Sequence, residues 1–437
     1  MAGNIDLTRR SLLKLAGATA GLAAAGRAGL APSRARAQDK PYAGVTLRGL
    51  TQGGIAYNAA LHQFSAEFEG QTGAKIEWDE QPWEQLMPKI QGELAAGTPS
   101  YDFFCNDIEF QYTIFPYLQP INELIEARGY NMDGFFDPIY KYGEGVAGGQ
   151  EGVRYGLPIQ VGSSWVFYRK DLIDQFPTTW AEYEALLESL TTDGKYGLSF
   201  AGVPAQLPKL FLARYWSQGD PLLTPDWKPL INSEKGIKAA QMLYDHMKRF
   251  APPGILGWDN PDASNAFLAG DAAVLEGWSA FILPDLDNPE KSQVVGNWAV
   301  GRYPENGSGN FVQHNMVIFN TSQNIEAAFD FIAYCTGLDN AKRLLLDYNV
   351  ESPRRAVWTE PDVLEQRPYL ESVAEAYNVA KPFAPGLPQW LEMFITLAEG
   401  LSAALSDQQE IPDMLNDVAS KWEELIKQAP PSFEYKE

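Results

Sequence analysis

Carboxylates and tryptophans are the residues of this chain whose types and positions could do chemistry. Asp107 and Glu109 follow the apolar segment 101–105. Two acids that face a sugar from opposite sides are the machinery of a glycosidase, although a pair of acids is weak support in a chain with 56 of them. Ligands of α/β proteins bind at the carboxyl ends of strands. The position of Asp107 and Glu109 after a strand therefore favours a ligand site at the end of that strand, either a binding site or a catalytic site.

Tryptophan is abundant, and four of the twelve follow short segments that contain Gly, Pro or Ser. A flat indole can cover the apolar face of a pyranose, while neighbouring acids, amides and arginines bind its hydroxyls. Packing in the core is the alternative for any single tryptophan. We predict a ligand cleft, and its candidate residues are Trp83, Asp107, Glu109, Trp165, Trp278 and Trp390.

Sequence motifs for catalysis are absent. The chain has no G-x-S-x-G, P-loop, H-E-x-x-H or Rossmann glycine pattern. Its three histidines, at positions 62, 246 and 314, are dispersed. Cys105 and Cys335 lie far apart in apolar contexts, which favours two buried thiols over a disulfide bridge. We therefore expect no catalytic residues, no metal and no cofactor.

The charge and the hydropathy of the chain argue against two further classes, nucleic-acid-binding proteins and membrane-spanning proteins. The net charge is −22, from 34 basic and 56 acidic residues, and this argues against a nucleic-acid partner, which requires a basic surface. No run of about 20 apolar residues occurs, so the sequence predicts no transmembrane helix. A composition that is 45% hydrophobic and 21% charged is typical of a soluble globular protein.

The first 37 residues predict an export signal. Arg9 and Arg10 precede the weakly apolar run 15–25, and Ala35-Arg36-Ala37 is a small-residue cleavage site. The paired arginines resemble a twin-arginine signal, and an ordinary secretion signal with two arginines is the alternative. In either case we expect a mature chain that begins near Gln38 and diffuses freely in the periplasm.

The mature chain alternates strands with helices. Strands are expected over residues 45–50, 74–78 and 101–105, with helices over 56–68 and 83–96 between them. Further elements are a short strand at 165–168, helices at 180–190, 235–247, 260–269 and 324–335, and two C-terminal helices between 391 and 426. The β-α-β-α-β order predicts an α/β fold with mostly parallel sheets.

Three segments together resemble the family 1 extracellular solute-binding proteins of ABC importers, the group that includes maltose-binding protein. Residues 155–158 and 165–172 are similar to the family's "G-L-P … Y-(N/R)-K-D-L" pattern. Residues 266–278 resemble its "F-x-x-G-x-A-A-M … G-x-W" stretch, and residues 295–304 its segment before the return crossing. The order and spacing of the three make the resemblance specific.

The resemblance implies two α/β lobes that close on a ligand by hinge bending. The first lobe is expected to hold residues 40–158 and 312–354, and the second lobe residues 159–311 and 355–437. Trp278 matches the tryptophan that stacks on sugar in several members of the family.

The function that the resemblance implies is capture of a carbohydrate or polyol-like solute and its delivery to the permease of an ABC importer. Asp107 and Glu109 match the family's polar positions after the third strand. A monomer is expected. An exported carbohydrate-active enzyme that uses these two acids is the alternative, and a periplasmic sensor subunit is a third possibility.

Overall fold

The computed structural model describes residues 40–97, 100–142, 152–219, 221–305, 307, 309–378, 380–383, 386–429 and 431. The predicted export signal over residues 1–37 lies outside them. No helix in these ranges is long and apolar enough to cross a membrane.

The chain opens with the predicted β-α-β-α-β unit. It consists of β1 (Thr46–Gln52), α2 (Tyr57–Thr72), β2 (Lys75–Gln81), α3 (Trp83–Ala95) and β3 (Phe103–Asp107). β1 lies between β2 and β3 and pairs parallel with both. All five elements were predicted within a few residues, because their apolar periodicity and their glycine and proline boundaries are local signals.

Two later strands extend this sheet. β8 (Asn310–Ile318) pairs antiparallel with β3 on one side and with β4 (Gly156–Arg169) on the other. The strand order is β2-β1-β3-β8-β4-β6-β5. β3 is therefore an interior strand, as its apolar sequence predicted.

β4 is shared by the two halves of the molecule. Its first half, residues 156–163, pairs with β8, and its second half, residues 164–169, pairs with β6 (Ala272–Trp278) and β7 (Trp298–Gly301). The sequence predicted only a four-residue strand at 165–168. The rest was missed because residues 156–164 carry glycines, serines and a proline.

The sheet is mixed rather than mostly parallel, which corrects the expectation from the sequence. β1–β2, β1–β3, β5–β6 and β8–β9 are parallel pairs, whereas all the other pairs involve β4 or β8 and are antiparallel. The two minor strands are β5 (Tyr196–Phe200) and β9 (Lys381–Pro382). β8 runs in the opposite direction to β3 and β4, and β4 runs in the opposite direction to β6 and β7, so these pairs are antiparallel.

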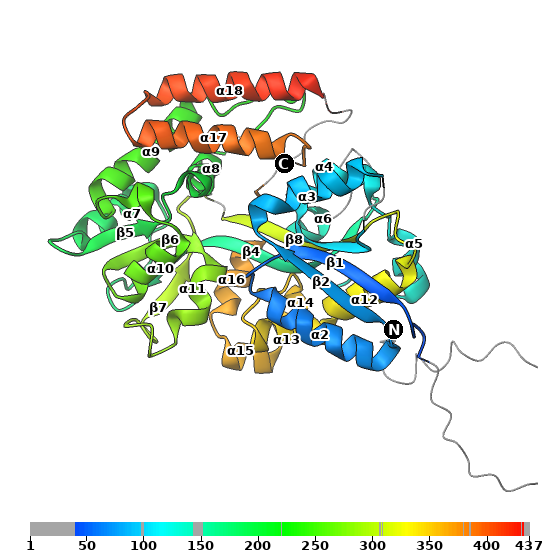
Figure 1. Ribbon diagram of the computed structural model, residues 1–437. Helices are drawn as coiled ribbons and strands as arrows, with labels where there is room; N and C mark the ends of the chain where they lie inside the picture. Colours follow the sequence, from blue (N-terminus) through cyan, green and yellow to red (C-terminus); the bar gives the residue numbers. More distant parts are fainter. Residues whose placement is uncertain are drawn as a thin grey trace, which may run out of the picture.

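Helices cover both faces of the first half (Figure 1). α2 packs with α12 (Ile325–Thr336) and α13 (Leu338–Asp347) against one face, in an apolar cluster that includes Phe103. α3 and α4 (Ile108–Ile114) cover the other face around Phe104. Cys105 on β3 and Cys335 on α12 are both buried free thiols.

The second half has its own, larger core. β5, β6 and β7 pack with α7 (Trp180–Leu190), α8 (Leu207–Ser217), α9 (Glu234–Phe250), α10 (Asn260–Leu268) and α11 (Ser279–Leu286). α7 begins where the sequence predicted, because Thr179 and Glu182 form a reciprocal capping box at its N-terminus.

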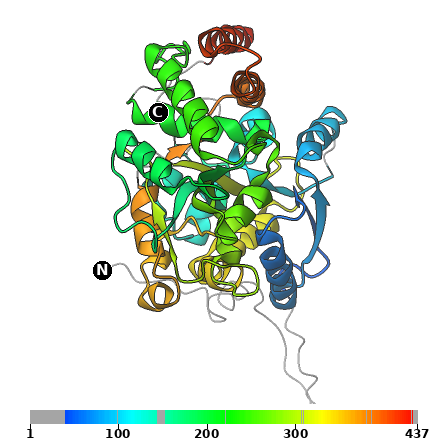
Figure 2. The same cartoon turned by 90° about the vertical axis from the view of Figure 1, so that its left-hand side faces the viewer.

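The C-terminal helix pair and the shorter helices complete the fold. α17 (Trp390–Leu405) and α18 (Ile411–Gln428) lie side by side along α8 and α9 (Figures 1 and 2), as predicted with a break near Ile411. The remaining helices are α5 (Asn122–Arg128), α6 (Asp137–Tyr142), α14 (Arg355–Trp358), α15 (Pro361–Gln366), α16 (Leu370–Tyr377) and the 3-10 turns η1 (Phe115–Tyr117), η3 (Pro204–Gln206) and η4 (Ile255–Gly257).

Among the residues that the structure describes, three segments connect the two halves: β4, β8 and the chain between α13 and α14. Val350 in the third segment belongs to the core of the first half, and Val357 a few residues later belongs to the core of the second. Any movement of one half against the other must bend these three segments.

A buried ion pair holds α8 against β6. Both guanidinium nitrogens of Arg214 donate to the Glu276 carboxylate, at 2.9 and 2.8 Å, and both side chains are fully buried. Tyr183 donates to the same carboxylate at 2.9 Å. These contacts fix the two elements that carry the second half of the candidate site.

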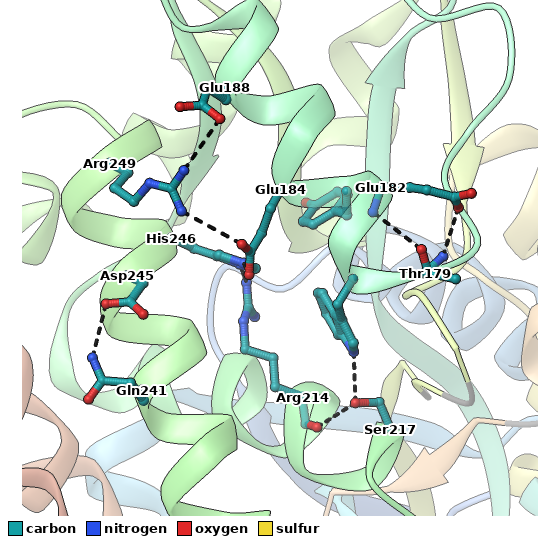
Figure 3. Close-up of polar contacts among 12 residues, drawn as sticks. Thr179, Glu182, Glu184, Glu188, Arg214, Ser217, Gln241, Asp245, His246 and Arg249 are labelled. Carbon is teal, nitrogen blue, oxygen red and sulfur yellow. Dashed lines mark hydrogen bonds and ion pairs between the residues drawn. The ribbon is translucent and has the colours of Figure 1, made fainter.

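His246 continues this network toward the surface (Figure 3). Arginine can only donate, so His246 Nδ1 accepts from Arg214 at 3.0 Å and Nε2 donates to Glu184 at 3.2 Å. Burial lowers the pKa of His246, and the Arg214 charge adds to this. The histidine is therefore a neutral structural link between Arg214 and Glu184.

Candidate functional site

Polar side chains interrupt the apolar crossing strands at the junction of the two halves. Gln160 on β4 and Asn310 and His314 on β8 are buried. Each has one polar atom, Gln160 Oε1, Asn310 Oδ1 and His314 Nδ1, with no hydrogen-bond partner among the residues that the structure describes. Ser163 Oγ, Gln313 Oε1 and Asn315 Nδ2, at alternate positions of the same two strands, are unpaired as well within the described ranges. Buried polar groups are otherwise nearly always paired, so these atoms mark the junction as a place where a ligand can bind.

The register places these groups on the face that carries Trp278. Gln160 lies opposite His314, and Ser164 lies opposite Trp278. Residues opposite each other, and residues two positions apart along a strand, share a face of the sheet. Gln160 and Ser164 on β4, Asn310 and His314 on β8, and Trp278 at the end of β6 therefore lie on one face across the crossing strands.

The first half of the chain contributes Asp107. This carboxylate ends β3 and is in hydrogen-bond contact with His314 Nε2. The edge of the His314 ring meets Tyr57 at the start of α2, with ring centroids 5.4 Å apart. Asp107 thus lies at the carboxyl end of its strand next to the crossing strand, the position predicted from the sequence.

The second half contributes a cluster around Trp278. Its Nε1 donates to Gln206 Oε1 at 2.8 Å, and Lys209 Nζ lies 5.0 Å from the centre of its rings. Asn310 Nδ2 on β8 donates to the Lys209 carbonyl at 2.9 Å. The start of α8 is therefore bound directly to the crossing strand.

Lys209 is an unusual residue in this cluster because it is 1% exposed. The hydrogen bond that Nζ makes is long, 3.4 Å to Asn260 Oδ1, and no carboxylate lies within ion-pair distance in the described part of the chain. Burial lowers the pKa of the amine to about 7, partly offset by the charges of Glu276 and Asp259.

A second buried acid, Glu351, lies in the third connecting segment. Ser279 donates to its carboxyl, and the backbone carbonyl of Glu351 accepts from Val161 of β4 at 3.0 Å. Burial raises the pKa of the carboxyl to about 8, although the hydrogen bond from Ser279 opposes this. The carboxyl is therefore protonated at neutral pH.

The structure brings some of the predicted site residues together. Phe383 packs edge-on against both Trp278 and Trp390, with centroids 5.9 and 6.3 Å apart. Thr113 on α4, the helix that follows Asp107, donates to the Pro388 carbonyl at 3.4 Å in the loop before Trp390. Trp278, Trp390 and Asp107 thus surround the same junction.

Apart from Trp278 and Asp107, the predicted residues are either buried or have side chains outside the described residues. Trp165 is 2% exposed and packs edge-on against Tyr377 at 5.0 Å, and Trp390 is 1% exposed and packs against Trp422. Both rings are enclosed by protein. The side chains of Trp83, at the start of α3, and Glu109, in α4, lie outside the described residues.

Several polar residues at the junction were not predicted. The most informative are Gln160, Gln206, Lys209, Asn310, His314 and Glu351. One signal was available, because Gln313-His314-Asn315 interrupts an otherwise apolar strand pattern. Lys209 could have been noticed as a lone cation in the mostly apolar segment 207–213.

No group of three or more acids, histidines or cysteines suited to a metal ion occurs within the ranges described. The chemistry that the site offers is hydrogen bonding by amides, a histidine, an amine and a carboxylate, next to an indole.

The sequence matches the profile of the bacterial extracellular solute-binding proteins over residues 53–342. The match covers more than half of the chain, and the protein therefore belongs to this family. It is a solute-binding protein of an ABC transporter and not an enzyme, which confirms the prediction from the three sequence segments.

Individual relatives agree with this assignment. A probable amino-acid ABC transporter periplasmic-binding protein of Sinorhizobium fredii, y4oP, is 24% identical over 423 residues, which span 94% of this chain and 97% of the relative. The alternative of an exported carbohydrate-active enzyme finds no support among these relatives.

Solved structures share the fold. A solute-binding protein of Agrobacterium radiobacter in complex with ribitol superposes with a TM-score of 0.77 at 24% identity, over 88% of this chain and all of the other. Maltose-bound MalE3 of T. maritima also gives a TM-score of 0.77, at 20% identity, over 87% of this chain and all of the other. The two-lobe α/β fold is thereby confirmed.

Proposed function

We propose that this protein captures a sugar or polyol between its lobes and delivers it to the permease of an ABC importer. The carrying observation is the set of buried, unpaired polar atoms of Gln160, Asn310 and His314 on the face that also carries Trp278. A sugar hydroxyl both donates and accepts, so it can pair with each of these atoms, while its apolar ring face can stack on the indole.

The site suits a sugar or polyol better than an amino acid, the ligand class in the name of the y4oP relative. A zwitterion needs a fixed anion for its ammonium group. The Asp107 carboxylate is shared with His314, so it can accept from a ligand hydroxyl but is not a free counter-charge for an ammonium group. Glu351 is protonated at neutral pH because burial raises its pKa to about 8. The ribitol and maltose complexes support the same choice.

The proposed lobes are residues 40–158 with 312–354 and residues 159–311 with 355–437. One apolar cluster consists of first-lobe residues apart from Ile159. The larger cluster consists mainly of second-lobe residues, joined by Ile108, Phe136, Ile139, Ala341 and Leu345 of the first lobe, and this distribution supports the division. We propose that the lobes close by bending of the three connecting segments. Small-angle scattering tests this: a radius of gyration that does not shrink with saturating ligand would count against closure.

For the predicted ligand-binding residues, we propose that Trp278 and Asp107 touch the ligand. Trp165 and Trp390 are buried and would shape the site from behind. Trp83 and Glu109 begin helices next to the ends of β2 and β3, and they stay predictions of ligand contact.

We further propose that the protein works as a periplasmic monomer, exported through its paired arginines. Replacing Arg9 and Arg10 by lysine should leave uncleaved precursor in the cytoplasm, because the translocase receptor reads the arginines. Fractionation and immunoblotting measure this, with Lys14→Arg as a control that keeps the pair. Normal processing of the double-lysine form would refute the twin-arginine route.

The ligand class is tested by a thermal-shift screen. A ligand that binds only the native state raises Tm with its concentration. We expect shifts with sugars or polyols and none with amino acids, followed by titration calorimetry on each hit. Shifts from amino acids alone would contradict the proposed function.

Trp278→Ala is expected to weaken binding of the best hit by about 5- to 150-fold, the equivalent of about 1–3 kcal/mol of lost apolar contact. Trp278 is only partly buried, so Tm of the free protein should change little. Trp78→Ala, a partly buried tryptophan on β2 whose Nε1 donates to Ser65, is the matched control and should keep the affinity. Unchanged affinity in Trp278→Ala would remove Trp278 from the site.

A further inference from the structure

We infer that the ligand of this site carries an anionic oxygen, as a sugar acid does, and that Lys209 binds it. The inference rests on the proposed function and narrows its ligand class. It begins with a charge imbalance at the edge of the site, where Arg214 and Glu276 form a closed pair and Lys209 remains as the surplus cation.

The amine of Lys209 has hydrogen-bonding capacity left over. An ammonium has three donors, and the contacts of Nζ are a 3.4 Å hydrogen bond to Asn260 Oδ1 and the indole of Trp278 at 5.0 Å. A buried charge without a counter-charge is costly, and the cost disappears when the group either loses its proton or gains an anion.

The acids of the neighbouring elements do not supply this anion. Glu276 on β6 is engaged by Arg214 and Tyr183. Asp259, before α10, accepts from the backbone of Asn260 as part of a helix cap. Both act on Lys209 only at a distance and raise its pKa less than burial lowers it.

The amine is buried, and its neighbours belong to the candidate site. Lys209 contacts the ring that we propose to stack on the ligand, and its backbone is bound by Asn310 of the crossing strand. Gln206 one turn earlier is bonded to the same indole. A carboxylate attached to a sugar that stacks on Trp278 would therefore lie near Nζ.

The net charge of −22 does not exclude an anionic ligand. Surface charges are screened beyond about 8 Å at physiological ionic strength, whereas a buried amine is screened much less. A charge-assisted hydrogen bond inside the site therefore outweighs the distant surface field.

The experiment compares acids with their neutral counterparts. D-gluconate is paired with D-glucitol, and D-glucuronate with D-glucose, and each is titrated by calorimetry against the full mature protein. We expect at least one acid to bind about 10- to 150-fold more tightly than its counterpart. Lys209→Met should abolish that preference and leave the neutral compound within about threefold of its wild-type affinity. Lys248→Met, an exposed lysine on α9, is the matched control.

A second measurement does not depend on the variant. The free amine is about half protonated at pH 7 because burial lowers its pKa to about 7. An anion bound at Nζ raises the pKa of the amine again. Binding of the acid at pH 7 should therefore be accompanied by uptake of about half a proton by Lys209. Calorimetry in buffers of different ionisation enthalpy measures this uptake, and Lys209→Met should lose it.

The outcomes are distinguishable. Acids that bind no more tightly than their neutral counterparts, or that fail to bind, overturn the inference, and neutral sugars that bind would then leave the proposed function intact. Tight acid binding without proton uptake, or with the preference retained in Lys209→Met, also overturns the role of Lys209. L-glutamate is titrated in the same way, and binding of L-glutamate but of none of the four sugar-derived compounds contradicts the proposed function itself.

Discussion

Arg214→Met is expected to lower the free energy of unfolding by about 3–5 kcal/mol, because it leaves the Glu276 carboxylate buried without its counter-charge. The loss includes both hydrogen bonds to Glu276 and the one to His246. Urea unfolding followed by circular dichroism measures the change.

Two further variants make this prediction specific. The double variant Arg214→Met with Glu276→Leu removes both charges and should recover most of the loss. Arg249→Met breaks the exposed end of the same network, where Arg249 lies 3.6 Å from Glu184 and 3.5 Å from Glu188, and should cost less than about 1 kcal/mol. Equal losses of unfolding free energy in Arg214→Met and Arg249→Met would show that the contribution of the Arg214–Glu276 pair to stability does not come from its burial.

Wild-type stability is expected to fall between about pH 4.5 and pH 8 through Glu351. Burial raises the pKa of this carboxyl from 4.5 to about 8. The folded state then binds more protons than the unfolded state in that window, so the contribution is fully present below pH 4.5 and is lost as the pH rises through 8. At 1.36 kcal/mol per pH unit, the loss is about 4–5 kcal/mol.

Glu351→Gln is the test of this pH dependence. The amide keeps the shape of the protonated acid and cannot ionise, so the variant should lose this slope and be more stable than the wild type at pH 8.5. Tm measured by calorimetry every half pH unit checks both. Glu360→Gln, an exposed acid in the same region, should leave the slope unchanged. If Tm of Glu351→Gln still fell with pH as in the wild type, other titratable groups would be responsible for the pH dependence.

Local signals predicted most of the helices and the first three strands. The helix predicted at 180–190 begins where Thr179 and Glu182 form a capping box, and the two helices predicted between 391 and 426 correspond to α17 and α18. Such features act within a few residues, so they can be interpreted without knowing the rest of the fold.

The site was harder to predict because it is assembled from distant parts of the chain. Asp107 and Trp278 could be predicted as candidates because each follows a strand or a glycine. Lys209 sits in a helix whose residues are all buried, and its place as a lone cation in an apolar segment does not reveal which side chains surround it. Its role depends on Trp278 and Asn310, which are 69 and 101 residues away and meet it only through the crossing strands.

The central position of β8 has a consequence for how the protein reaches its native state. β8 lies between β3 and β4, yet the ribosome makes it about 200 residues after β3. Until then, β3 presents an open edge to other strands, and an open edge invites aggregation. Contacts so distant in sequence also form slowly.

A chain that stops before residue 310 should therefore be poorly soluble, although it contains the complete β-α-β-α-β unit, and a chain that extends through β8 and α12 should be more soluble. If the shorter chain proved equally soluble and protected from hydrogen exchange, β8 would not be needed to close the first sheet. Otherwise, nascent chains of this protein depend on chaperones for most of their synthesis.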